Sequence, residues 1–79
     1  MNLKFLFFGA TAEAVGLRGF EFETDEGLVV SDLPKLLAHN YPPLSDREII
    51  FAVNEEYVKP DTALKHGDEI AIFTAVSGG

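Results

Sequence analysis

Hydrophobic and polar residues alternate over several short stretches of the chain, and these stretches predict strands. Residues 3–8 (LKFLFF) are almost wholly apolar, whereas Phe and Glu alternate in residues 19–24 (GFEFET). Residues 48–53 (EIIFAV) and 69–73 (EIAIF) are rich in Ile, Phe and Val, which favour extended structure. Alternation is typical of a strand that buries one face. The pattern predicts four main strands, with a further short strand at residues 57–58.

One main helix is predicted between the second and third long strands. Leu33, Leu36 and Leu37 have the spacing of a single apolar stripe along a helix. Ser31 is expected to cap the start of this helix, and the Tyr-Pro-Pro sequence at residues 41–43 is expected to end it. This helix would pack its leucine stripe on one face of the sheet.

A second, short helix is predicted at residues 11–16 (TAEAVG), with Thr11 as its cap and Gly16 as its stop. One main helix on one face of a mixed sheet indicates a two-layer α+β domain. The order of elements suits the β-grasp, or ubiquitin-like, arrangement, in which the first strand lies centrally beside the last. We expect a single domain over residues 1–79, with a flexible tail at residues 74–79.

Part of the apolar surface of this sheet is left without a helix to cover it. Side chains alternate between the two faces of a strand, and the faces that carry Lys4 and Glu69 are the expected open ones. Four apolar side chains of two adjacent strands then share the open face: Leu6, Phe8, Ala71 and Phe73.

Phe8 and Phe73 come from separate strands and converge where the tail begins. Contiguous exposed apolar surface marks a protein-binding site, and Tyr57 is a further candidate for it. The alternative is that both Phe side chains are covered by loops near the strand ends.

The composition narrows the classes of function. The chain has 79 residues, 47% of them hydrophobic, with no cysteine and a formal net charge of -7. The absence of cysteine excludes disulfides, a thiol nucleophile and a cysteine-held iron–sulfur cluster. The acidic balance disfavours nucleic acid and suits a partner with basic groups, although charge also serves solubility alone. The apolar runs are too short to span a membrane and no signal peptide is present, so we expect a cytoplasmic protein.

No catalytic or metal-binding motif stands out before the tail. His39 and His66 lack metal-ligand spacing, and the glycines form no phosphate-binding loop, so we expect no metal site. The chain is therefore expected not to be an enzyme acting alone. Its remaining reactive group is the carboxylate of Gly79, which follows Gly78. A diglycine end can thread a narrow channel to an enzyme that activates the carboxylate with ATP, although a frayed end or a linker has the same composition.

Several segments together resemble the small subunit of molybdopterin synthase, a sulfur-carrier family of molybdenum-cofactor biosynthesis. They are FLFFGATAEAVG, the helix after Ser31, FAVNEEYV, LKHGDEIAIF and the final VSGG. The resemblance covers almost the whole chain. The family is similar to the thiamine-pathway sulfur carrier and, more distantly, to ubiquitin.

This resemblance implies a sequence of reactions at the tail. An E1-like adenylyltransferase would adenylate Gly79 with ATP and Mg²⁺, and a sulfur donor protein would supply the sulfur of a thiocarboxylate. The loaded tail would enter the large subunit, which carries the catalytic residues, within a heterotetramer. There it would donate sulfur to cyclic pyranopterin monophosphate to form the dithiolene of molybdopterin. No cofactor would be bound stably to the carrier itself.

The resemblance also implies site residues. Gly79 and Gly78 would form the reactive end, and the contact surface for the large subunit would include Phe8, Tyr57, Phe73 and Val76. The chain departs from the family pattern at Thr74-Ala75, where proline is frequent, and at Ala12-Glu13, where many members have a basic residue.

Three other functions remain open at this point. The chain could be a thiamine-type sulfur carrier, although its extended TAEAVG segment favours the molybdopterin type. It could be a ubiquitin-like modifier joined through Gly79 to lysine, since the activation chemistry is shared. It could also be a β-grasp interaction module whose tail has no function.

Overall fold

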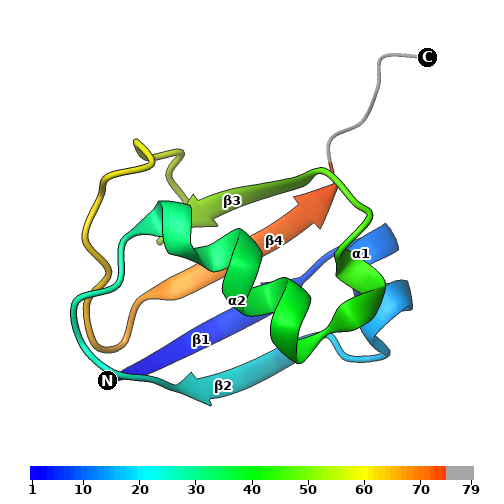
Figure 1. The fold of residues 1–79 in the computed structure, drawn as a ribbon, viewed down its shortest axis with the longest axis horizontal. Coiled ribbons are helices and arrows are strands. Elements are labelled where there is room, and N and C mark those ends of the chain that lie inside the picture. Colours follow the sequence, from blue (N-terminus) through cyan, green and yellow to red (C-terminus); the bar gives the residue numbers. More distant parts are fainter. Residues whose placement is uncertain (75–79) are drawn as a thin grey trace.

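A computed structural model describes residues 1–74, which form a four-stranded sheet with helices packed on one face (Figure 1). The strands are β1 (Asn2–Phe7), β2 (Gly19–Glu23), β3 (Ile49–Val53) and β4 (Glu69–Thr74). The helices are α1 (Ala10–Val15) and α2 (Leu33–Asn40), with 3-10 turns η1 (Val30–Asp32) and η2 (Pro42–Leu44). The predicted α+β, β-grasp class is confirmed.

The first and last strands are neighbours in the middle of the sheet. The strand order is β2-β1-β4-β3, in which β1 and β4 are parallel and the two outer strands pair antiparallel to them. Phe5 lies opposite Ile70 and Phe7 opposite Ile72. Because parallel strands end at the same edge of a sheet, the end of β1 lies beside the end of β4, where the chain leaves the sheet.

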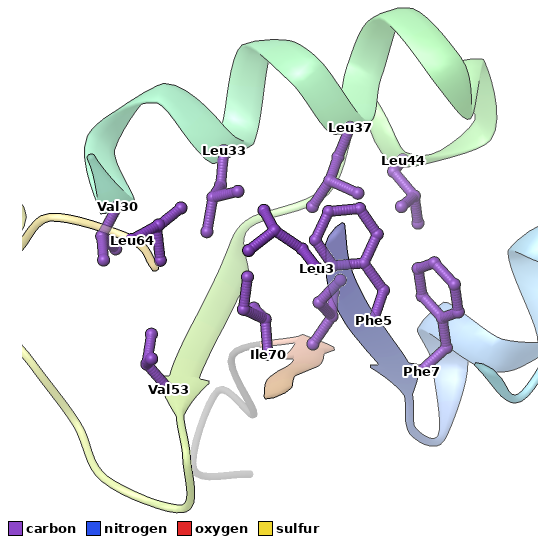
Figure 2. Packing of buried hydrophobic residues seen from close by; sticks show 11 residues of the cluster. Leu3, Phe5, Phe7, Val30, Leu33, Leu37, Leu44, Val53, Leu64 and Ile70 are labelled. Carbon is purple, nitrogen blue, oxygen red and sulfur yellow. The ribbon is translucent and has the colours of Figure 1, made fainter. Parts of the chain in front are cut away.

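The core lies between the sheet and α2 (Figure 2). Alternate residues of the central strands point into it, as the period-two pattern predicts, and the leucine stripe of α2 packs against them. Phe5 also stacks on Phe22 of β2, with 5.6 Å between ring centroids. The buried cluster contains Leu3, Phe5, Phe7, Val30, Leu33, Leu37, Leu44, Val53, Leu64, Ile70 and Ile72.

Tyr41 closes the core beside β2. Its ring makes edge contacts with Phe7 and Phe20, at centroid distances of 5.4 and 6.3 Å. Burial raises the pKa of the Tyr41 phenol above its ordinary value. Phe20 and Phe22 share a face, as predicted, but Phe20 remains 43% exposed because β2 is an edge strand.

The predicted strand at residues 57–58 is wrong. Glu56 makes one isolated bridge with Val53, and the segment that follows pairs elsewhere. Backbone hydrogen bonds connect it to the residues before α2: Val30 N–H donates to the Thr62 carbonyl and Leu64 N–H to the Leu28 carbonyl. This segment therefore covers one end of the core instead of extending the sheet.

The predicted cap of the main helix is also wrong. Ser31 lies inside η1, and its backbone N–H donates to the Pro60 carbonyl at 2.9 Å. The side chain that acts at this helix start belongs to Asp32, whose Oδ2 accepts from the Val29 N–H at 2.9 Å. The helical turn begins earlier than the sequence pattern indicates, since η1 runs directly into α2.

The boundaries of the short helix differ from the prediction at one end. Thr11 is the second residue of α1 and Gly9 occupies the N-cap position, so Thr11 is not a cap. Gly16 does end the helix, with a left-handed φ of 80° and an N–H that donates to the Ala12 carbonyl at 2.8 Å. Glycine adopts this conformation without a Cβ clash.

The last strand extends one residue further than predicted, to Thr74. Thr74 belongs to β4 and pairs with Ile49 of β3, because a β-branched residue at this position extends the ladder. The expected flexibility of the rest of the tail concerns residues outside those that the structure describes.

The turn after β3 holds two non-glycine residues in the left-handed region. Asn54 has φ 50° and Glu55 has φ 68°. Asn54 is held by hydrogen bonds: its Nδ2 donates to Asp68 Oδ1 at 2.9 Å, and its Oδ1 accepts from the Glu69 N–H at 3.0 Å. Asparagine tolerates this conformation, whereas glutamate has no such local advantage.

We therefore expect Glu55→Gly to stabilise the fold. The left-handed conformation costs an ordinary residue about 1–2 kcal/mol, which glycine avoids. Glycine in turn lowers stability by about 0.4–1 kcal/mol, because it increases the conformational entropy of the unfolded chain. The free energy of unfolding should rise by about 0.5–1 kcal/mol, measured by urea denaturation. The matched control is Glu56→Gly, at a position without positive φ, which should lower stability. Equal or reversed effects of the two substitutions would contradict the explanation.

Candidate functional site

The sheet face opposite α2 carries apolar side chains near the end of β4. Leu6 lies opposite Ala71 in the register of β1 and β4, and Phe73 lies opposite Ile50 of β3. All four side chains are partly exposed. Two exposed aromatic residues, Phe8 and Tyr57, flank these four side chains. We call the six residues together the apolar patch: Leu6, Phe8, Ile50, Tyr57, Ala71 and Phe73.

Phe8 stands at one side of the apolar patch. The β1 strand ends at Phe7, but the Phe8 N–H donates to the Ile72 carbonyl at 3.0 Å, which keeps Phe8 beside the end of β4. The chain then turns at Gly9, with φ 55°, into α1. The Phe8 side chain is 51% exposed. Loops therefore do not bury it, contrary to the alternative that the sequence left open.

Tyr57 stands at the other side and contacts Phe73. Their rings meet edge to face, with centroids 6.2 Å apart and planes inclined at 69°. This is a favourable aromatic geometry. Tyr57 is nevertheless 74% exposed, so most of its ring faces solvent. The structure thus brings the three predicted contact residues Phe8, Tyr57 and Phe73 to one face.

A shallow hollow continues the apolar patch toward α1. It lies between the end of β1 and the helix, and Leu17, which follows the helix, is 42% exposed beside it. Sequence reasoning did not single out Leu17, because an isolated leucine after a helix carries no signal of its surroundings. The lining residues of the hollow are Leu6, Phe7, Phe8, Gly9, Ala12, Glu13, Gly16, Leu17 and Arg18.

Charged residues border the apolar patch on the side away from the tail. Lys4 of β1 lies between Glu21 of β2 and Glu69 of β4 in the strand register. The open face therefore changes along its strands from a charged row with excess negative charge to an aromatic row at the start of the tail. A complementary surface would be basic at one end and apolar at the other.

The predicted reactive end is not described by the structure. Gly78, Gly79 and Val76 lie outside residues 1–74, whereas Thr74, the last described residue, belongs to the strand that carries Phe73. The apolar patch therefore adjoins the point where the tail starts. This arrangement suits a docking surface that positions a chain end for chemistry on another protein.

Other candidate chemistry has structural explanations. The ring nitrogen Nδ1 of His66 accepts from the Asn2 N–H at 2.9 Å, which ties a turn to the start of β1. Within residues 1–74, no group of three or more His, Cys, Asp or Glu side chains could hold a metal ion. No helix in this part of the chain is long and apolar enough to cross a membrane.

Comparisons with known proteins agree with this fold. The chain is 37% identical to the molybdopterin synthase sulfur carrier subunit of Chlamydomonas reinhardtii, over 100% of both chains. A putative molybdopterin converting factor subunit 1 from Pyrococcus furiosus superposes with a TM-score of 0.88 at 26% identity, over 96% of this chain and 99% of that one. SAMP1 from Haloferax volcanii superposes with a TM-score of 0.83 at 28% identity, over 100% of both.

A family model also matches nearly the full length of the chain. The model of the ThiS family matches residues 5–79, which include all six residues of the apolar patch and the diglycine end. Because this match spans almost the whole sequence and the algal carrier subunit aligns from end to end, the chain belongs to the ThiS family.

Proposed function

We propose that this chain is the sulfur carrier subunit of a molybdopterin synthase. The observation that carries the proposal is the end-to-end alignment with a curated protein of that name at 37% identity. The structural counterpart is the exposed apolar patch where β4 leads into the diglycine tail. A carrier needs such a surface because its own residues bring the chain end to an active site that another protein provides.

The proposed chemistry takes place at the carboxylate of Gly79. An E1-like adenylyltransferase joins this carboxylate to AMP from ATP, with Mg²⁺, and pyrophosphate leaves. Sulfur from a donor protein then displaces AMP to give a thiocarboxylate. Two loaded carriers in turn each form a bond from the thiocarboxylate sulfur to cyclic pyranopterin monophosphate in the large subunit, which supplies the catalytic residues of the heterotetramer. Water then cleaves the resulting thioester, so that the sulfur stays on the pterin and Gly79 leaves as a carboxylate. Gly78 and Gly79 fit a narrow channel, since neither has a Cβ.

In this proposal the apolar patch docks the carrier on the large subunit. Phe8, Tyr57 and Phe73 are aromatic residues, a class that is enriched in the cores of protein–protein interfaces. Residues 75–79 can reach at most roughly 17 Å beyond Thr74 when fully extended, so docking must bring the active site within that distance. Val76, inside this span, would contact the channel. We place the complex in the cytoplasm.

The thiamine-type carrier shares the activation steps and the family, so the acceptor of the sulfur separates it from this proposal. A protein modifier is the second candidate, because SAMP1 from Haloferax volcanii, which is a small archaeal modifier protein, superposes over the full length of both chains. In a modifier the activated Gly79 would form an amide with a lysine amine, whereas a carrier would keep a terminal thiocarboxylate.

Changing the length of the tail should abolish sulfur loading. Deletion of Gly79, or one extra residue after it, displaces the reacting carboxylate from its place in the activating enzyme. The free energy of unfolding should stay within about 0.5 kcal/mol, because terminal substitutions away from a core have small effects. Intact mass of protein purified from cells with the native partners measures loading as a gain equal to sulfur minus oxygen.

The matched control is Ser77→Ala, which keeps the length and both glycines and should load normally. Normal loading of the extended tail would contradict the proposed role of Gly79. High-mass conjugates that end at Gly79, without a thiocarboxylate fraction, would favour the modifier.

Substitutions in the apolar patch should weaken docking more than folding. Phe8→Ala and Tyr57→Ala remove exposed rings, so each should reduce affinity for the large subunit roughly tenfold or more and change unfolding free energy by less than about 1 kcal/mol. Isothermal calorimetry and thermal unfolding measure the two effects. Phe5→Ala, in the core, should instead cost about 3–5 kcal/mol of stability.

The matched control for docking is Phe20→Ala. Phe20 is 43% exposed, but it pairs with Phe5 in the register and so belongs to the helix-covered side of the sheet. Its loss should leave the affinity unchanged. An equal loss of affinity for Phe20→Ala and Phe8→Ala would show that the apolar patch is not the docking surface.

A further inference from the structure

Thr11 is the one buried polar side chain among residues 1–74, with no exposed surface. It lies in α1 directly above the point where β1 and β4 end. Its Oγ1 lies 2.7 Å from the Phe8 carbonyl oxygen, 2.8 Å from the Ile72 carbonyl oxygen and 3.1 Å from the Phe8 nitrogen. One hydroxyl group therefore contacts both central strands at the edge where the tail begins.

These contacts can be assigned to donors and acceptors. The Thr11 hydroxyl has one hydrogen, which is shared between the two carbonyls, and its oxygen accepts from the Phe8 N–H. The Phe8 N–H also donates to the Ile72 carbonyl at 3.0 Å, and the Thr11 N–H donates to the Phe8 carbonyl at 3.2 Å. Both carbonyls and the Phe8 N–H thus keep a backbone partner without the hydroxyl.

The hydroxyl is therefore not needed to satisfy buried backbone groups. Valine is similar in volume, but its methyl group would lie at hydrogen-bond distance from the two carbonyl oxygens, closer than a nonbonded contact allows, so these short contacts require a hydroxyl. What the hydroxyl adds is a second connection between the two strand ends. Its contribution should then be seen in the position of the residues that it holds more than in the stability of the fold.

The residues that it holds are adjacent to the apolar patch. The paired register of β1 and β4 ends at Phe7 and Ile72, and Gly9 turns the chain away with φ 55°. One cross-strand hydrogen bond, from the Phe8 N–H to the Ile72 carbonyl, still connects Phe8 to β4, and the Thr11 hydroxyl adds contacts to both polar groups of the Phe8 backbone. On the other strand, the hydroxyl contacts the Ile72 carbonyl, which is bonded to Phe73.

We propose that Thr11 is a positioning residue for docking: its hydroxyl ties the end of β1 to the end of β4 and thereby sets Phe8 relative to Phe73. The inference rests on the proposed function, because it assigns to those two aromatic residues a role in binding the large subunit. The proposal gives α1 two roles: the helix covers part of the core, and its residue Thr11 positions Phe8 on the open face.

The test compares Thr11→Val, Thr11→Ser and a matched core control, Ile70→Val. Ile70 is fully buried near the start of β4, away from the edge where β1 and β4 end, and loss of its methylene should lower stability to an extent comparable with loss of one hydrogen bond. Affinity for the large subunit is measured by calorimetry. Thr11→Val should bind roughly three- to tenfold more weakly than wild type, the equivalent of one hydrogen bond. Thr11→Ser should restore most of the affinity, and Ile70→Val should bind as wild type does.

A second measurement does not need the partner. Amide hydrogen exchange by NMR should show the Phe8 amide exchanging several-fold faster in Thr11→Val than in Ile70→Val at matched stability. Because the new methyl group of Thr11→Val would also crowd the two carbonyl oxygens, the same measurements are made on Thr11→Ser and Thr11→Ala, which differ only by the hydroxyl: Thr11→Ala should bind more weakly and exchange faster at Phe8 than Thr11→Ser.

The outcomes separate the two proposals. Equal affinity and equal Phe8 exchange in Thr11→Val and Ile70→Val would overturn the positioning role and leave Thr11 as a packing residue. If the wild-type chain does not bind the large subunit, the proposed function fails, while faster Phe8 exchange in Thr11→Val would still support the connection between the strand ends.

Discussion

The parallel pairing of β1 with β4 is the constraint on which the rest of this molecule depends. It joins the two ends of the sequence in the centre of the sheet and makes both strands end at one edge. The side chain that follows β1 and the last aromatic residue of β4 then lie together, although they are far apart in sequence. The chain leaves the sheet at the same edge. The apolar patch and the start of the tail are therefore adjacent as a consequence of topology.

The same pairing gives the two central strands one face that is buried in the core and one face that is open. Phe5, Phe7, Ile70 and Ile72 are buried under the helices and supply the hydrophobic stabilisation of the fold. Their neighbours in sequence point to the open face, where they bury less surface and contribute less to folding. Large aromatic side chains can therefore stay exposed without loss of the core, and this exposure is what a partner can use.

The sequence predicted this division because alternation in a strand depends on local backbone geometry alone. The faces of β1 and β4, the main helix and its leucine stripe were predicted on that basis and are confirmed. The predictions of Ser31 as a helix cap and of a strand at residues 57–58 were wrong, because hydrogen bonds between residues 60–64 and the segment before α2 determine the structure of both regions. Thr11 was interpreted as a cap for the same reason: its partner Ile72 is distant in sequence, and no local pattern indicates that contact.

Burial of one hydroxyl at the edge of an otherwise apolar core also has a consequence for how a carrier works. Under the proposed function, the chain end would be presented first to an activating enzyme and later to an acceptor, so a fixed position of the residues at the start of the tail before either partner binds would be an advantage. Ordering them on docking would cost conformational entropy twice in each cycle. Regular pairing cannot extend past Phe7 where the chain turns into α1. The hydroxyl of Thr11, from that helix, then adds contacts to both strand ends beside the last cross-strand hydrogen bond, from the Phe8 N–H to the Ile72 carbonyl.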